Sequence, residues 1–266
     1  MTVVRTRTRR GTEVHHVEHG AGRPVLVLHG AGVDHRETEG CFEPVFDGVA
    51  GFRRIYPDLP GMGRTAAPER MRSAEDVLDT LLDYAGEVTD GAAHLVIGHS
   101  AGAYYAQAMA ARAPEQVVGL ALVCPLLPGH RDAPEHRIVV GSGALGDDGF
   151  RSYFVVQSPE MRDRYERFVR PGAALVDHAA LERIGERWEL SGDQGPAFGG
   201  PTLIVAGRVD STVGFAAAAD LVHHYPRGSL AVLDDAGHAL PHEQPDLLRA
   251  LVAEWLARVE RAGWKP

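Results

Sequence analysis

The sequence predicts an α/β protein whose sheet is mostly parallel and carries helices on both faces. Short, continuous apolar runs alternate with longer segments in which the apolar residues recur at helical spacing. A strand that is buried on both faces gives such a continuous run, and its alternation with helices is typical of a parallel sheet. With 266 residues, the chain is long enough for one such domain with a modest insertion.

The predicted strands and helices follow one another in a regular order. Residues 2–9 and 13–18 are expected to form an opening hairpin, followed by buried strands at 25–28, 53–57, 94–97, 117–123, 201–206 and 230–233. Helices are expected at 42–49, 73–88, 101–111 and 247–259. The helix at 73–88 has the clearest start, because Ser73 is a favourable N-cap residue and Asp76 stands three positions later.

A serine flanked by glycines stands where a predicted strand meets a predicted helix. The segment Gly98-His99-Ser100-Ala101-Gly102 fits the pattern Gly-x-Ser-x-Gly, in which a tight turn raises the serine above the sheet. Because the turn is strained, glycines are needed to leave room for the backbone. We expect Ser100 to be a nucleophile, and we expect the N–H of Ala101, at the start of the helix, to donate to an oxyanion.

Three further segments follow the ends of predicted strands. They are His29-Gly30-Ala31-Gly32, Gly207-Arg208-Val209-Asp210 and Asp234-Asp235-Ala236-Gly237-His238. The serine segment lies between the first and the second of them. In this order, the four segments give the chain a resemblance to the α/β-hydrolase family that extends over nearly its whole length. The resemblance implies a catalytic triad of Ser100, Asp210 and His238. It also implies an oxyanion hole formed by the backbone N–H groups of Ala31 and Ala101.

The three side-chain types of this triad suit nucleophilic catalysis. A serine hydroxyl is a weak nucleophile unless a base takes its proton, and the imidazole of His238 can do so near neutral pH. Asp210 would orient the imidazole and stabilise its charged form. Asp234 and Asp235 compete for the role of the acid, but they share the loop of His238 and are poorly placed to reach its Nδ1.

The alternation of strands and helices breaks between residues 126 and 199. This region contains two helical stripes of apolar residues, namely Met161, Tyr165 and Phe168, and Leu181, Ile184 and Trp188. The resembled family inserts its cap at this position, so we expect residues 126–199 to form a helical lid over the active site. Residues 1–125 and 200–266 would then form the α/β-hydrolase core.

Composition and charge exclude several classes of function. The formal net charge of −9 argues against a nucleic acid or an anionic membrane as partner. The two cysteines are not spaced as metal ligands, and no apolar stretch is long enough to span a membrane. We therefore expect a cytoplasmic protein that acts on a small molecule without a metal or another cofactor. The sequence leaves open whether the protein forms a homodimer.

Two other motifs suggest alternatives that the sequence does not favour. The segment 141–146 fits Gly-x-Gly-x-x-Gly, but the acidic residues after it suit a flexible loop better than a dinucleotide site. His15 and His16 are expected on one strand, where neighbouring side chains face opposite sides and cannot share a metal. Residues 34–36, Asp-His-Arg, could rim the pocket, but we expect them at the surface.

These observations lead to one predicted function with two alternatives. We expect a serine hydrolase that cleaves small carboxylic esters or lactones through an acyl-enzyme. The alternatives are a hydrolase that cleaves C–C bonds of ketone intermediates with the same triad, and a receptor that binds a small ligand without turnover. The resemblance leaves the choice among them open, because a shared fold does not determine the substrate. Ser100 argues against the dehalogenase and epoxide-hydrolase branches of the family, since these need a carboxylate nucleophile.

Overall fold

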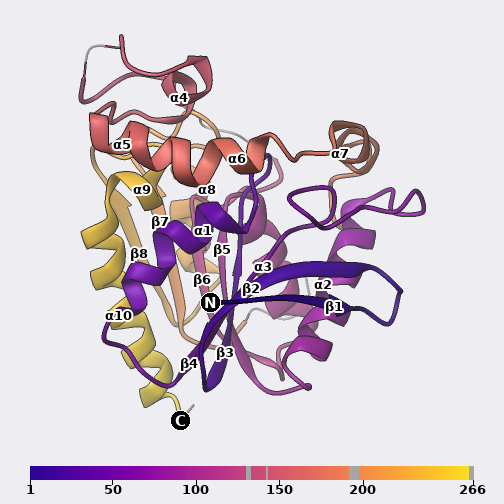
Figure 1. Ribbon diagram of the computed structural model, residues 1–266. Helices are drawn as coiled ribbons and strands as arrows, with labels where there is room; N and C mark the ends of the chain where they lie inside the picture. Colours follow the sequence, from indigo (N-terminus) through magenta and orange to yellow (C-terminus); the bar gives the residue numbers. More distant parts are fainter. Residues whose placement is uncertain (130–132, 142, 192–197, 264–266) are drawn as a thin grey trace.

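The computed structural model describes residues 1–129, 133–141, 143–191 and 198–263. Its centre is a sheet of eight strands in the order β1-β2-β4-β3-β5-β6-β7-β8 (Figure 1). The strands are β1 (Thr2–Arg7), β2 (Glu13–Gly20), β3 (Arg23–Leu28), β4 (Phe52–Pro57), β5 (His94–His99), β6 (Val117–Val123), β7 (Thr202–Gly207) and β8 (Gly228–Leu233). The pairs β1–β2 and β2–β4 are antiparallel and all other neighbours are parallel, which confirms the predicted fold class.

Helices connect the strands. Those between β3 and β6 are α1 (His35–Phe42), the 3₁₀ helix η1 (Glu43–Phe46), α2 (Ala74–Val88) and α3 (Ala101–Arg112). Between β6 and β7 lie α4 (Asp148–Tyr153), α5 (Pro159–Arg164), the π-helix η2 (Tyr165–Val169), α6 (Arg170–Ala173) and α7 (His178–Gly185). After β7 come α8 (Ala216–Asp220), the 3₁₀ helix η3 (Leu221–His223), α9 (Leu240–Glu243) and α10 (Pro245–Arg261).

The hydrophobic core has one layer on each face of the sheet. Side chains of β3 alternate between the two layers, as the pleat of a strand requires. Leu26 belongs to the cluster that contains Leu78 of α2, whereas Val25 belongs to the cluster that contains Phe42 of α1 and Trp255 of α10. Helices therefore cover both faces, and the carboxyl ends of the parallel strands stay free for a site.

The first helix differs from the sequence prediction. A helix is expected at 42–49, but α1 occupies residues 35–42 and the short η1 follows it. The side chain of Asp34 caps the start of α1. The prediction is wrong because α1 buries the polar residues Glu37 and Thr38 and therefore lacks the apolar stripe that marks a helix in a sequence.

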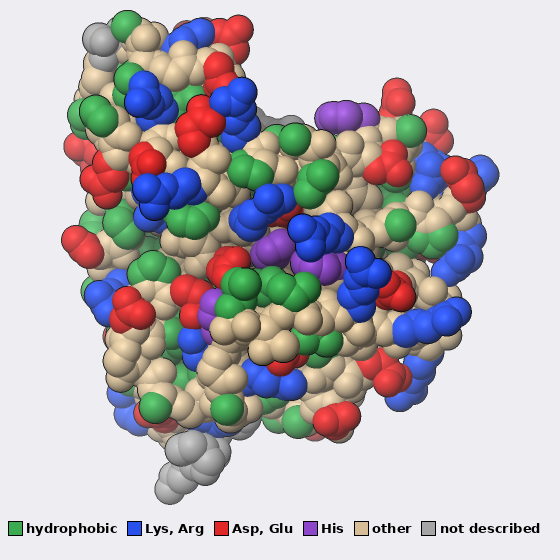
Figure 2. Space-filling view, in the orientation of Figure 1, with side chains coloured by type: hydrophobic (Ala, Val, Ile, Leu, Met, Phe, Trp, Pro, Cys, Tyr) green, Lys and Arg blue, Asp and Glu red, His purple; other side chains and the backbone are tan. Residues whose placement is uncertain are grey.

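The C-terminal helix α10 lies where the sequence predicts one. Its inner face buries Leu248, Val252 and Trp255, all at 0% exposure, whereas Leu247 is 48% exposed and does not belong to this face. Within the described residues, no helix is both long and apolar enough to cross a membrane. Basic and acidic side chains are interspersed over the face seen in Figure 2.

Residues 126–199, which we call the insertion, stand between β6 and β7 and carry α4 to α7. Figure 1 shows α4, α5 and α6 above the sheet. Phe150 and Phe154 are fully buried in a cluster with Val33 and Ala239 from the rest of the chain. These two side chains therefore pack the described segment around α4 onto the core.

The two predicted apolar stripes of the insertion contribute unequally to the buried hydrophobic clusters. Met161 and Tyr165 are buried in the cluster of Phe150, and Ile184 is buried against the main core. The apolar piece at 137–140 forms no strand, and its last residue makes a single bridge to Val156. The predicted Gly-x-Gly-x-x-Gly segment includes Ser142, which lies outside the described residues.

Candidate active site

Ser100 sits in the tight turn that its sequence motif predicts. It joins β5 to α3 with a φ of +54°, a backbone conformation that non-glycine residues rarely adopt. A Cβ added to Gly98 would lie 2.4 Å from the backbone oxygen of Gly102, and one added to Gly102 would lie 2.3 Å from that of Leu28. Gly98 is therefore required for the close approach of β5 to the start of α3, and Gly102 for the close packing of the turn against the end of β3.

The structure brings the three predicted triad residues together at the carboxyl ends of the strands. Ser100 Oγ lies 2.9 Å from Nε2 of His238, and Nδ1 of His238 lies 2.8 Å from Oδ2 of Asp210. Asp210 follows β7 and His238 follows β8. The competing Asp234 and Asp235 are exposed, so the sequence prediction named the carboxylate that contacts His238.

Hydrogen bonds hold the Asp210 carboxylate in place. Its Oδ1 accepts the N–H groups of Thr212 at 2.8 Å and Val213 at 3.0 Å. Burial raises the pKa of Asp210, but the attraction and hydrogen bond of His238 and the two backbone N–H groups outweigh burial and bring the pKa below its usual value. The ionised Asp210 accepts the Nδ1–H of His238, which leaves Nε2 free to take a proton from Ser100.

The two predicted oxyanion donors flank Ser100. Ala101 is the first residue of α3, so its N–H belongs to the helix end that has no intrahelical acceptors. Ala31 stands in the loop after β3 and lines the cavity above Ser100. A Cβ added to Gly30 would lie 3.2 Å from the Cβ of Ser100, so this loop runs directly beside the serine.

A cavity of about 220 Å³ opens above Ser100. The core contributes Gly30, Ala31, Gly32, Val33, His99, Ser100 and His238 to its wall, and the insertion contributes Gly149, Tyr153, Tyr165, Val169 and Ala173. None of these described lining residues is an aspartate, glutamate, lysine or arginine. Apart from its two histidines, the described wall of this small cavity therefore carries no charged side chain.

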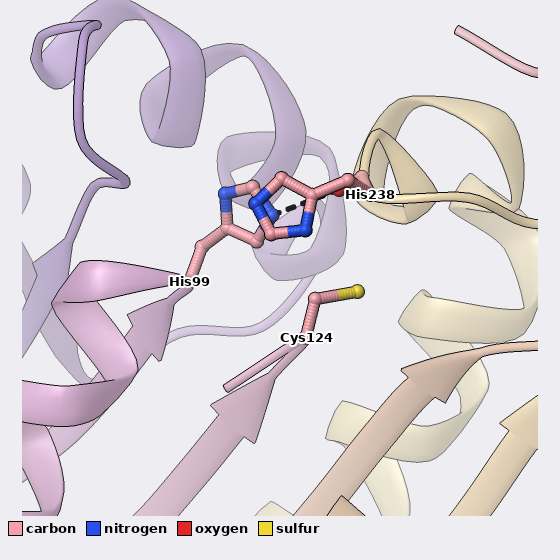
Figure 3. Close-up of side chains that lie close together, drawn as sticks. All are labelled: His99, Cys124 and His238. Atoms are coloured by element: carbon pink, nitrogen blue, oxygen red, sulfur yellow. Dashed lines mark hydrogen bonds between the residues drawn. The ribbon is translucent and has the colours of Figure 1, made fainter. Parts of the chain in front are cut away.

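A second buried histidine supports the loop of His238. Nε2 of His99 donates a hydrogen bond of 3.0 Å to the backbone oxygen of His238 (Figure 3). Nδ1 of His99 lies 3.0 Å from Oε1 of Glu37, which also accepts the hydroxyl of Tyr153 at 3.4 Å. Glu37 and His99 are almost completely buried. No local pattern in the sequence marks this pair, because Glu37 lies 62 positions before His99.

The buried pair carries charge. Burial raises the pKa of Glu37, but the attraction and hydrogen bond of His99 outweigh burial and bring the pKa to about 2. Burial lowers the pKa of His99, but Glu37 outweighs burial here too and raises the pKa above its usual value. The pair therefore behaves as an ion pair beneath the triad.

Three groups of side chains in the described part of the chain lie close enough together to hold a metal ion. They are His99, Cys124 and His238; His15, His35 and Asp58; and Glu37, Cys41 and His242. In the first group (Figure 3), His238 bonds the other triad residues, and burial raises the pKa of the Cys124 thiol well above its usual value. A metal needs a thiolate and a free imidazole nitrogen, so this group fits a metal poorly.

The segment after the oxyanion loop lies inside the protein rather than at its surface. Asp34 and His35 are 1% and 9% exposed. Asp34 pairs with Arg36, and Nδ1 of His35 lies 2.7 Å from Oδ1 of Asp58. The predicted surface position is therefore wrong for Asp34 and His35, because the cap of α1 and the Asp58 carboxylate use these polar side chains.

Comparison with known proteins agrees with this geometry. The profile described as "Alpha/beta hydrolase family" matches residues 25–251. The chain belongs to the alpha/beta hydrolase family. The predicted resemblance and the assignment as a hydrolase are thereby confirmed.

Relatives of this alpha/beta hydrolase carry different names. The chain is 28% identical over 260 residues to the magnesium-chelatase 30 kDa subunit of Rhodobacter capsulatus, covering 88% of this chain and 87% of that one. It is 26% identical over 267 residues to 2-hydroxymuconate semialdehyde hydrolase of Pseudomonas sp. (strain CF600), covering 92% and 90% of the two chains. The family is therefore shown, but the relatives do not agree on one substrate.

Solved structures share the fold along nearly the whole chain. An alpha/beta superfamily hydrolase from Oenococcus oeni PSU-1 has a TM-score of 0.88 and 25% identity, covering 97% of this chain and 99% of that one. A thermophilic esterase from Thermogutta terrifontis has a TM-score of 0.69 and 24% identity, covering 97% and 99%. At 24% identity, the similarity to the Thermogutta terrifontis esterase shows a shared fold only.

Proposed function

We propose that this alpha/beta hydrolase cleaves small, uncharged carboxylic esters or lactones through an acyl-enzyme. The observation that supports the proposal is the unbroken chain of contacts from Ser100 through His238 to Asp210. These residues lie at a small cavity whose described wall, apart from two histidines, carries no charged side chain. A nucleophile, a base and a residue that orients the base are the parts that acyl transfer needs.

In the first half of the reaction, Ser100 Oγ attacks the carbonyl carbon of the ester. Nε2 of His238 takes the hydroxyl proton, and Asp210 stabilises the imidazolium that forms. The N–H groups of Ala31 and Ala101 hold the negative oxygen of the tetrahedral intermediate. When the intermediate collapses, the ester C–O bond breaks, and His238 gives its proton to the leaving alkoxide.

In the second half, water releases the acyl group. His238 takes a proton from water, and the hydroxide oxygen attacks the acyl carbon of the acyl-enzyme. The same two N–H groups hold the second tetrahedral intermediate. Its collapse breaks the bond to Ser100 Oγ, which recovers its proton from His238, and the carboxylic acid leaves.

Cavity size and polarity set the proposed substrate class. A volume of about 220 Å³ is smaller than the roughly 300–1,000 Å³ of sites that hold drug-sized ligands. Tyr153, Tyr165 and Val169 of the insertion line the cavity together with Ser100. We infer that residues 126–199 act as a lid that selects short acyl or alcohol groups, as the sequence predicts.

Cleavage of C–C bonds is the second candidate, because several relatives carry such names. One is a 2-hydroxy-6-oxo-6-(2'-aminophenyl)hexa-2,4-dienoic acid hydrolase, whose named substrate carries a carboxylate at neutral pH. The described lining residues offer no lysine or arginine to bind this group. Arg164 of the insertion is directed elsewhere, since it donates to His242 and to the backbone oxygen of Gly40. His99 also lines the cavity, but it is already paired with Glu37. The cavity therefore favours the uncharged ester or lactone.

Two measurements on the purified chain test the proposal. We expect turnover of p-nitrophenyl acetate and of a small lactone, and labelling of Ser100 by a fluorophosphonate, located by mass spectrometry. Ser100→Ala should lose both activities. Labelling without turnover of any ester or lactone would favour the ligand receptor. Faster cleavage of a 2-hydroxy-6-oxohexa-2,4-dienoic acid than of the esters would establish the C–C hydrolase instead.

A further inference from the structure

The carboxylate of Glu243 joins two segments that are far apart in the sequence. Glu243 ends α9 and is 8% exposed. Its Oε2 accepts the N–H of Gly237 at 2.7 Å, and its Oε1 accepts the N–H groups of Val155 at 2.7 Å and Val156 at 3.1 Å. One buried carboxylate therefore binds the loop before His238 and the part of the insertion that follows α4.

We propose that Glu243 is a positioning residue that links the seating of the insertion to the orientation of His238. The inference rests on the proposed function, because it takes His238 as the catalytic base. Glu243 does not line the cavity and would act only through the backbone groups that it holds.

The backbone around His238 is held from both sides. Glu243 binds the N–H of Gly237, and His99 donates to the oxygen of His238. Because the main chain of His238 is held in this way, only its side-chain torsions still have to be set for the imidazole to contact Ser100 and Asp210. A shift of the loop by about 1 Å would move Nε2 out of the range for proton transfer, and misplacement of this size can reduce a rate about 100-fold.

The insertion touches the same loop directly. A Cβ added to Gly237 would lie 2.7 Å from Cγ1 of Val155, so the valine packs against the glycine without space between them. Tyr153 lines the cavity, and its ring stands edge-on to His238 at 6.1 Å between centroids. The segment 153–156 thus forms part of the cavity wall and also contacts the loop of the base.

The three hydrogen bonds are strongest with an ionised carboxylate. A carboxylate accepts at both oxygens, whereas a protonated acid or an amide presents a donor at one of them. Three titratable residues on other elements interact electrostatically with Glu243, namely Asp210, Cys124 and Tyr153. Burial raises the pKa of Glu243 and Asp210 adds to the rise, while the three N–H groups oppose it, with a pKa of about 7 as the result. Near neutral pH, a proton on Glu243 would therefore weaken the hydrogen bond to one of the two segments.

The test combines a wild-type titration with Glu243→Gln in the full chain. In the wild type, we expect the backbone amide NMR signals of Gly237, Val155 and Val156 to change together with one midpoint near pH 7. In the variant, this shared transition should disappear and these amides should exchange faster with solvent. For p-nitrophenyl acetate, kcat should fall at least about 10-fold while KM changes less. Glu254→Gln, at an exposed position of α10, is the matched control and should leave all four measurements unchanged.

The outcomes separate this inference from the proposed function. Separate midpoints for Gly237 and Val155 in the wild type, or an unchanged kcat in a folded Glu243→Gln protein, would overturn the positioning role. The wild-type titration tests whether Glu243 couples the insertion to the loop of His238 even if the variant does not fold. Absence of ester turnover in the wild type would count against the proposed function alone, because the amide titration does not depend on a substrate.

Discussion

His99, the residue before the serine, donates a hydrogen bond of 3.0 Å to the backbone oxygen of His238. The turn that carries Ser100 therefore also supports the loop that carries His238. Glu37 completes this support from the opposite side of His99, at 3.0 Å. The two histidines differ in role, since His238 contacts Ser100 directly and His99 acts through the main chain.

The buried pair of Glu37 and His99 predicts a loss of stability in acid. The folded pKa of Glu37 is about 2, against 4.5 for the unpaired group. Its contribution to stability is therefore present above pH 4.5 and is lost as the pH falls towards 2, by about 3 kcal/mol at about 1.4 kcal/mol per pKa unit. Urea unfolding at pH 6, 4 and 3 measures this loss, and Glu37→Gln should reduce it. An equally steep loss in the variant would mean that other carboxylates cause the acid sensitivity.

Removal of the nucleophile should abolish catalysis and keep the fold. Ser100→Ala removes the only atom that attacks the substrate in the proposed mechanism, so kcat/KM for p-nitrophenyl acetate should fall at least about 1,000-fold. Circular dichroism and the thermal midpoint check that the fold is kept. Residual activity with an unchanged pH profile would point to a different nucleophile.

The acid can be distinguished from its neighbours. Asp210→Asn should lower kcat by about 10,000-fold with KM nearly unchanged, because the amide favours the wrong imidazole tautomer. Asp234→Asn and Asp235→Asn are matched controls on the loop of His238, where both side chains are exposed. They should retain nearly full activity, and a larger loss in either control would show that the acid is wrongly assigned.

Two opposite changes in the wall of the cavity should shift chain-length preference in opposite directions. Val169→Ala enlarges the cavity and Ala173→Phe narrows it, since both residues line it. One methylene in an apolar pocket is worth about 1–3 kcal/mol, so the ratio of kcat/KM for p-nitrophenyl hexanoate to acetate should rise about 10-fold in the first variant and fall in the second. Leu175→Ala, at a residue that is 44% exposed, should leave the ratio unchanged. Equal ratios in all four proteins would show that the insertion does not select the substrate.

The sequence determined the sheet and the triad because their signals are local. Strands buried on both faces give continuous apolar runs, and the triad residues follow the ends of such runs. Parallel strands end at one edge of the sheet, so Ser100, Asp210 and His238 could be expected to meet although long segments separate them. The same reasoning failed for α1, whose buried side chains are polar.

Only the tertiary structure decided what surrounds the triad. Nothing in the sequence marks Glu37 or Glu243 as buried, yet each lies inside the protein beside partners from distant segments: His99 contacts Oε1 of Glu37, and backbone N–H groups bind Glu243. A buried carboxylate is stable only with such partners, and no local pattern announces them. The size of the cavity and the side chains that line it depend in the same way on how the insertion packs above Ser100, which is a property of the folded chain alone.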